Sequence, residues 1–140
     1  MTSPSRRHHS RTGLWAGRIL SGLPALFLLV DGAMKLVKPE VVVRTTVGLG
    51  YAETAIVPLG VVLLACVILY VIPRTAVLGA ILLTGYLGGA VATHVRAGNG
   101  PFEILFPVGL CALLWAGLVV RDDRLRALVF RRAEPARLGR

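Results

Sequence analysis

The chain has 140 residues, of which 55% are hydrophobic and only 16% are charged, and its mean hydropathy is +0.72. Soluble domains carry about 25% charged residues, and disordered chains are poor in apolar residues, so the composition excludes both classes and predicts a membrane protein. The net charge of +9 comes mainly from basic residues near the two chain ends, without a nucleic-acid-binding motif. We therefore expect no nucleic acid partner and a lipid bilayer as the surroundings.

Four stretches of the chain are apolar enough to cross a hydrocarbon core of about 30 Å, which takes about 20 helical residues. The predicted spans are residues 14–37, 54–73, 75–95 and 103–120. The first contains Arg18, Asp31 and Lys35, whereas the second contains no charged residue and the third carries only His94, which we expect to be neutral. The sequence thus predicts an all-α, integral membrane four-helix bundle.

This bundle is expected to occupy residues 13–130, between mobile basic tails at residues 1–12 and 131–140. Loops on the cytoplasmic side of a membrane are enriched in Lys and Arg. If both termini are cytoplasmic, that side holds twelve Lys and Arg residues and the outer side holds four. We therefore expect both termini inside and two glycine-containing loops, residues 38–53 and 96–103, outside.

Small residues recur every fourth position along the third span, a spacing that lets helix backbones approach closely in lipid. We expect this helix to be the central element of the bundle, with one stripe also able to contact a second protomer. The predicted packing residues are Ala80, Thr84, Gly85, Gly88, Gly89 and Ala92.

Ionisable side chains in or beside the spans are functional candidates, because a charge in hydrocarbon costs several kcal/mol. Asp31 and Lys35 are one helical turn apart with the acid first, so they can neutralise each other. The predicted ligand or proton site near the outer face consists of Asp31, Lys35, Glu53, His94 and Glu103. A purely structural network of ion pairs explains the same residues, and no catalytic residue is identified.

Cys66 and Cys111 are the only cysteines, and their positions predict apolar packing at different depths rather than dithiol chemistry. No paired histidines that would ligate haem lie within the spans. We therefore expect no metal, and no cofactor is evident from motifs.

Residues 83–96, LTGYLGGAVATHVR, resemble the third-helix signature of the DoxX-like membrane proteins. Three shorter segments are similar to other parts of that family and support the resemblance. They are Asp31-Gly32-Ala33-Met34-Lys35-Leu36 at the first helix end, Gly48-Leu49-Gly50-Tyr51 in the first outer loop, and Leu114-Trp115-Ala116-Gly117-Leu118 with Arg121-Asp122 in the last helix. The likeness covers about residues 18–126.

The resemblance implies a multi-pass protein of the bacterial cytoplasmic (inner) membrane, in a family named after a subunit of a thiosulfate:quinone oxidoreductase. It implies an accessory subunit of a quinone-linked membrane redox system, with a quinone as ligand and a redox protein or a second copy of the chain as partner. A noncatalytic membrane assembly or small-molecule-binding protein is the alternative. The sequence does not establish that the protein is an enzyme.

Overall fold

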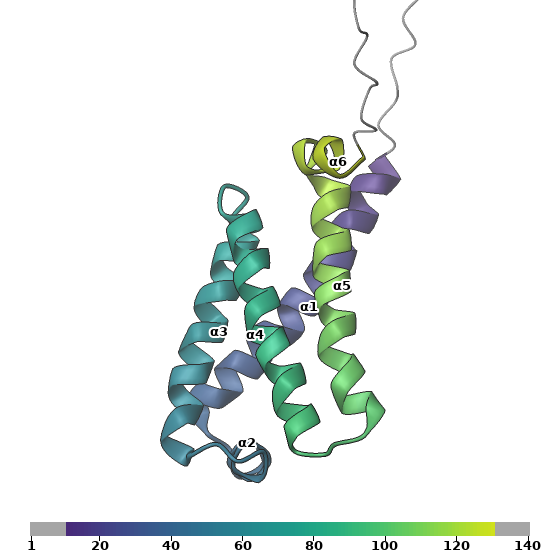
Figure 1. Ribbon diagram of the computed structural model, residues 1–140. Helices are drawn as coiled ribbons and strands as arrows, with labels where there is room; N and C mark the ends of the chain where they lie inside the picture. The colour runs from purple at the N-terminus through teal and green to yellow at the C-terminus, as the bar shows by residue number, and fades with distance from the viewer. Residues whose placement is uncertain (1–10, 131–140) are drawn as a thin grey trace, which may run out of the picture.

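The computed structural model describes residues 11–130 of the chain. The predicted mobile tails lie outside this range, except that Arg11 and Thr12 already belong to the first helix. The elements in chain order are α1 (Arg11–Val37), α2 (Glu40–Gly48), the 3₁₀ turn η1 (Glu53–Ala55), α3 (Ile56–Val71), α4 (Ala76–Arg96), α5 (Pro101–Arg121) and α6 (Asp123–Phe130) (Figure 1).

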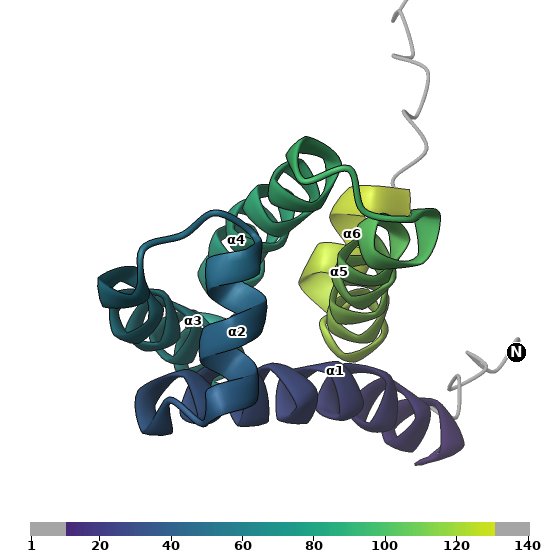
Figure 2. The ribbon, with the colours of Figure 1, turned by 90° about the horizontal axis from the view of Figure 1, so that it is seen from below.

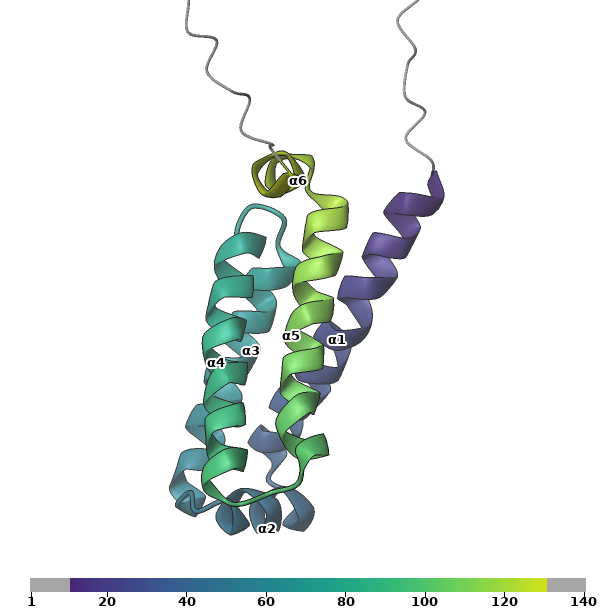
Figure 3. The same cartoon turned by 45° about the vertical axis from the view of Figure 1, so that its right-hand side comes forward.

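Four helical segments are long and apolar enough to cross a membrane: α1, α3 together with η1, α4 and α5. The predicted all-α four-helix membrane fold is therefore confirmed. The 27 residues of α1 extend about 40 Å, which exceeds the apolar thickness of a bilayer, so this helix must tilt to remain within it. Figure 3 shows α1 inclined to the other three spans.

The four spans form a ring in which α1 and α4 occupy opposite positions. α1 packs mainly against α3 and α5, and α4 packs against the same two helices. The view from the α2 end shows this order (Figure 2). The prediction that the third span is the central element is therefore wrong, because each span has two principal neighbours.

The closest helix contacts are made at glycines outside the predicted packing stripe. A Cβ on Gly79 of α4 would overlap the backbone of Tyr70 on α3, and a Cβ on Gly117 of α5 would lie 2.6 Å from Ser21 on α1. Between these helices the core contains fully buried side chains such as Leu63, Leu83 and Leu114. Backbone contact at a few points, rather than a continuous stripe, thus brings the spans together.

Two short helices lie across the ends of the bundle (Figure 1). α2 occupies part of the segment predicted as the first outer loop, and it begins with Pro39 as N-cap followed by Glu40 in the first turn. Both are residues that favour a helix start. α6 lies at the opposite end, where Asp122 Oδ1 accepts hydrogen bonds from the backbone N–H groups of Arg124 and Leu125, 2.9 and 3.2 Å long.

Candidate functional site

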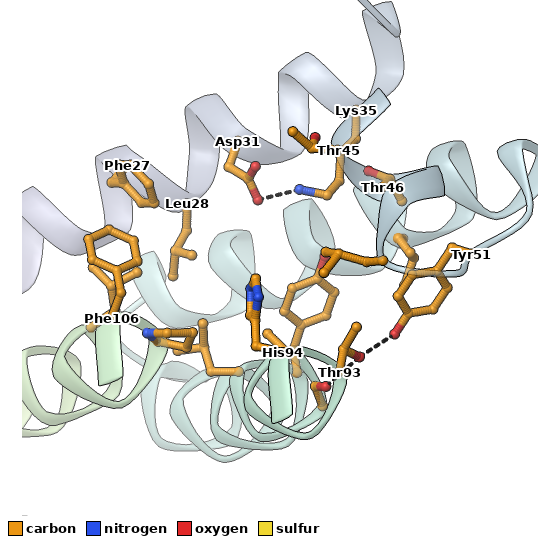
Figure 4. A pocket seen from close by; sticks show the side chains of 18 of the residues that line it. Phe27, Leu28, Asp31, Lys35, Thr45, Thr46, Tyr51, Thr93, His94 and Phe106 are labelled. Carbon is orange, nitrogen blue, oxygen red and sulfur yellow. Dashed lines mark hydrogen bonds and ion pairs between the residues drawn. The ribbon is translucent and has the colours of Figure 1, made fainter. Parts of the chain in front are cut away.

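A cavity of about 480 Å³ opens at the α2 end of the bundle, where α1 and α4 face each other. Residues of α1, α2, α3, α4 and α5 line it (Figure 4). Because α1 and α4 are not neighbours in the ring, their backbones do not pack against each other. Side chains line the space between them. The volume falls within the range of small-molecule sites, about 300–1,000 Å³.

One part of the cavity is apolar. Phe27 and Leu28 of α1 and Phe106 and Leu110 of α5 contribute to its wall. The rings of Phe27 and Phe106 meet edge to face with centroids 5.3 Å apart, a favourable aromatic geometry. Phe27 is 48% exposed and Phe106 is 41% exposed, so the aromatic pair lies on the bundle surface as well as on the cavity wall, and this part of the cavity adjoins the lipid.

The other part carries charge. Lys35 Nζ donates a hydrogen bond to Asp31 Oδ2 at 2.5 Å, and the two side chains are 14% and 36% exposed. His94 extends from α4 on the opposite wall, facing the ion pair across the cavity (Figure 4). The arrangement combines a neutralised ion pair, which still has unused hydrogen-bonding capacity, with an imidazole.

Small residues on α4 make the cavity possible. Gly85 and Gly89 line it, and a Cβ built on either would meet no atom within 4 Å. These two glycines therefore leave space for the cavity and make no close helix contact within the chain. The prediction that Gly85 and Gly89 pack against a neighbouring helix is therefore wrong within the described chain.

Of the remaining predicted packing residues, Ala80 is 1% exposed and lies in the core. Thr84, Gly88 and Ala92 are exposed instead, and a Cβ on Gly88 would meet nothing within 4 Å. The predicted role in packing within the bundle is thus wrong for Gly88 and Ala92, because α4 turns that face away from the other spans. Thr84 does contact a neighbouring span, since its hydroxyl accepts a 2.9 Å hydrogen bond from Trp115 Nε1 of α5.

The α2 segment closes the end of the cavity and is fastened to α4. Gly50, with a φ of +89°, ends α2 in a turn in which the N–H of Tyr51 bonds to the carbonyl of Thr46 at 3.3 Å. This turn directs Tyr51 back over the bundle, where its hydroxyl lies 2.8 Å from Thr93 Oγ1 (Figure 4). Arg96 adds a 3.0 Å hydrogen bond to the carbonyl of Leu49, a favourable position for a cation at a helix C-terminus.

Two predicted site residues lie elsewhere. Glu53 accepts a 2.7 Å hydrogen bond from Lys38 in an exposed ion pair, and it is not among the residues that line the cavity. Glu103 is exposed in the first turn of α5, where a carboxylate interacts favourably with the helix N-terminus. The structure thus brings together Asp31, Lys35 and His94, but it does not bring Glu53 and Glu103 to them.

Sequence reasoning did not assign Tyr86, Thr45 and Thr46 to the site, although all three line the cavity. A signal for Tyr86 exists, since it precedes His94 by eight residues and positions separated by about two helical turns share a face. Thr45 and Thr46 lie in a segment whose sequence predicts a loop, so no helical spacing assigns them to the site. In residues 11–130, no three His, Cys, Asp or Glu residues form a cluster that could hold a metal ion, and both cysteines are free.

Comparison with known families identifies the family to which the chain is similar. The sequence model of the DoxX-like family matches residues 19–117, a range that includes Asp31, Lys35 and His94 and ends before α6. No curated protein and no solved structure matches the chain.

Proposed function

Because the chain belongs to the DoxX-like family of proteins, we propose that it is an accessory protein of a quinone-linked membrane redox system and that its cavity binds a quinone. The observation that carries this proposal is the cavity of about 480 Å³ with a charged and an apolar part. Lipid-soluble molecules with a polar head group need both kinds of surface in one site.

The chemistry of the lining residues supports a quinone-like ligand. Phe27, Phe106 and Leu110 offer aromatic and aliphatic surface to a ring and to the start of an apolar tail. His94 and Lys35 can donate hydrogen bonds to carbonyl oxygens, and Asp31 retains a carboxylate oxygen outside its 2.5 Å bond to Lys35. The proximity of the apolar part to the lipid-facing surface supports uptake from the membrane.

The arrangement of charges supports a place in the bacterial cytoplasmic membrane with both termini inside. The start of α1, the turn between α3 and α4, and α6 all lie at one end of the bundle (Figure 1). Arg74, Arg121 and Arg124 belong to that end, as expected for a cytoplasmic side. The cavity would then open in the outer half of the bilayer, toward α2.

A noncatalytic assembly protein is the second candidate, and one observation favours it. Gly88 and Ala92 form a short exposed strip of small residues on α4, one helical turn apart, that no other span covers within the described chain. In lipid such a strip permits close approach of another helix. A second copy of the chain or a membrane redox protein is the partner that this hypothesis requires.

Native mass spectrometry of the protein released from native-lipid nanodiscs separates the two candidates. The quinone hypothesis predicts a retained mass of quinone size in the wild type, lost in Asp31→Asn, which leaves Lys35 without its partner and alters the polar wall. Glu40→Gln is the control, because Glu40 pairs with Arg44 on the exposed side of α2 at 2.8 Å. A ligand-free oligomer or partner complex would contradict the quinone hypothesis and favour assembly.

A further inference from the structure

The turn that follows α4 places an amide beside the cavity histidine. Gly98, with a φ of +69°, allows the chain to fold back, so that its N–H bonds to Val95 O at 3.1 Å and the N–H of Asn99 bonds to His94 O at 3.0 Å. This is the Schellman arrangement of a helix C-terminus, which needs a left-handed residue. Asn99 is thereby held against the last turn of α4, next to the imidazole.

The side chains of the two residues form a short hydrogen bond. Asn99 Nδ2 lies 2.7 Å from His94 Nδ1. An amide nitrogen only donates, so Nδ1 must accept this bond, and a neutral imidazole that accepts at Nδ1 carries its hydrogen on Nε2. The amide therefore selects one tautomer of the ring.

The second ring nitrogen is available to a ligand. Within residues 11–130 the bond to the Asn99 amide is the one hydrogen bond that the His94 side chain makes, and no buried side-chain nitrogen or oxygen there lacks a partner. Nε2 is therefore not sealed inside the protein. Since His94 lines the cavity and faces the Asp31–Lys35 pair (Figure 4), its N–H is accessible from the cavity.

The hydroxyls of Thr93 and Tyr51 are poorly suited to the same task. Thr93 uses its only hydroxyl hydrogen to bond Gly89 O at 2.9 Å, so it must accept the 2.8 Å bond that joins it to Tyr51. The hydrogens of both groups are thus engaged within the protein. On the α4 wall, the hydrogen bond to Asn99 orients the Nε2–H donor of His94 before a ligand binds.

We infer that Asn99 is a positioning residue that holds His94 as the Nε2–H tautomer, so that the imidazole donates a hydrogen bond to a carbonyl oxygen of the cavity ligand. The ligand part of this inference rests on the proposed function and specifies it, because a quinone in its oxidised form presents two carbonyl acceptors. The tautomer itself does not depend on that function.

Nitrogen-15 NMR of the protein labelled at histidine, in nanodiscs, tests the tautomer directly. The chain has three histidines, so replacing His8 and His9 by Gln leaves His94 as the only imidazole signal. In spectra of the neutral ring, recorded at alkaline pH, we expect the wild type to carry its proton on Nε2. Asn99→Asp should move the proton to Nδ1, since a carboxylate only accepts.

The functional part is measured on the same samples by titration with a short-chain benzoquinone. In Asn99→Asp the unprotonated Nε2 faces the carbonyl, and we expect the affinity to fall about tenfold, as for the loss of one hydrogen bond. Glu40→Gln should bind as the wild type does. Asn99→Ala is a second variant that keeps the test valid if the aspartate disturbs folding. In this variant the nitrogen-15 chemical shifts of the His94 ring should move toward the average of the two tautomers.

The outcomes are distinguishable. A wild-type proton on Nδ1, or an Asn99→Ala ring that stays fully in the Nε2–H form, would overturn the positioning role. An Asn99→Asp protein that changes tautomer yet binds the benzoquinone as tightly as the wild type would overturn the donation to a carbonyl. A wild type with the expected tautomer that binds no benzoquinone would contradict the proposed function and leave the positioning role standing.

Discussion

Asp31 and Lys35 illustrate how a charged pair is tolerated within a span. Their 2.5 Å contact joins side chains one turn apart on α1, and it removes the net charge that would otherwise face hydrocarbon. An ionisable group at membrane depth costs several kcal/mol when it is alone, and breaking a buried pair leaves the second charge uncompensated. The pair thus explains why α1 can cross the bilayer despite its polar residues.

The ion pair should couple the two positions energetically. Asp31→Asn and Lys35→Gln should each lower the free energy of unfolding by about 2 kcal/mol, because each leaves one charge without its partner. The double variant should lose less than the sum, since it leaves no charge. Unfolding in mixed micelles, followed by circular dichroism, gives the coupling energy. Strictly additive losses would show that the two charges do not stabilise each other.

The glycines of α4 have opposite roles on different faces of the helix. Gly79 lies against the backbone of Leu69 and Tyr70 at the tight turn from α3, whereas Gly88 faces open space. The sequence pattern alone treats both as small residues at helical spacing. Only the rotation of the helix about its axis decides which glycine meets a backbone, which one lines the cavity and which one faces lipid.

Alanine scanning of these two glycines is expected to give effects of opposite sign. Gly79→Ala should destabilise the bundle by about 3 kcal/mol, because the added Cβ overlaps backbone that cannot yield easily. Gly88→Ala should raise stability by up to about 1 kcal/mol, the helix propensity difference between the residues. Thermal unfolding in detergent measures both. Equal losses at the two positions would contradict the observed rotation of α4.

The spans could be predicted from the sequence because a membrane imposes length and apolarity on any helix that crosses it. α2 could not be found in this way, since Glu40–Gly48 is too short to span and is rich in β-branched residues, which disfavour helix. The start signal of Pro39 and Glu40 and the turn at Gly50 do mark it locally. Its stability comes from tertiary contacts such as buried Val42 and Thr46, which no local pattern contains.

The candidate site was predictable to the extent that it lies on spans. Asp31, Lys35 and His94 share a depth and line one cavity, as their places along the helices suggest. Glu53 and Glu103 share that depth too, but the directions of η1 and of the first turn of α5 place them outside the cavity lining. Depth follows from counting residues along a helix, whereas direction around the axis depends on how neighbouring helices pack.

For the whole molecule, the ring of spans gives the two ends different characters. One end has α6 and the arginine-rich turn and helix ends, and the other has α2 and the cavity (Figures 1 and 2). The basic residues that flank membrane spans set orientation. The cavity and the arginine-rich end should therefore be on opposite sides of the membrane.

Cysteine accessibility tests this orientation in cells. With Cys66 and Cys111 replaced by Ala, Arg74→Cys reports the turn between α3 and α4, and Ala97→Cys reports the end of α4. Both positions are exposed. A membrane-impermeant maleimide added on the proposed outer side of the membrane should label Ala97→Cys and spare Arg74→Cys until the cells are permeabilised. Labelling of both from outside, or of Arg74→Cys alone, would contradict the proposed topology.

Quinone titration of Gly89→Leu against Gly88→Leu in nanodiscs shows whether the space beside α4 is a binding site. The two substitutions are identical and lie on neighbouring residues of one helix, yet of the two glycines only Gly89 lines the cavity, and a Cβ built on either would meet no atom within 4 Å. We predict that both proteins fold, that Gly89→Leu loses benzoquinone binding because its side chain fills the cavity, and that Gly88→Leu binds as the wild type does. Undiminished binding by Gly89→Leu would contradict the account.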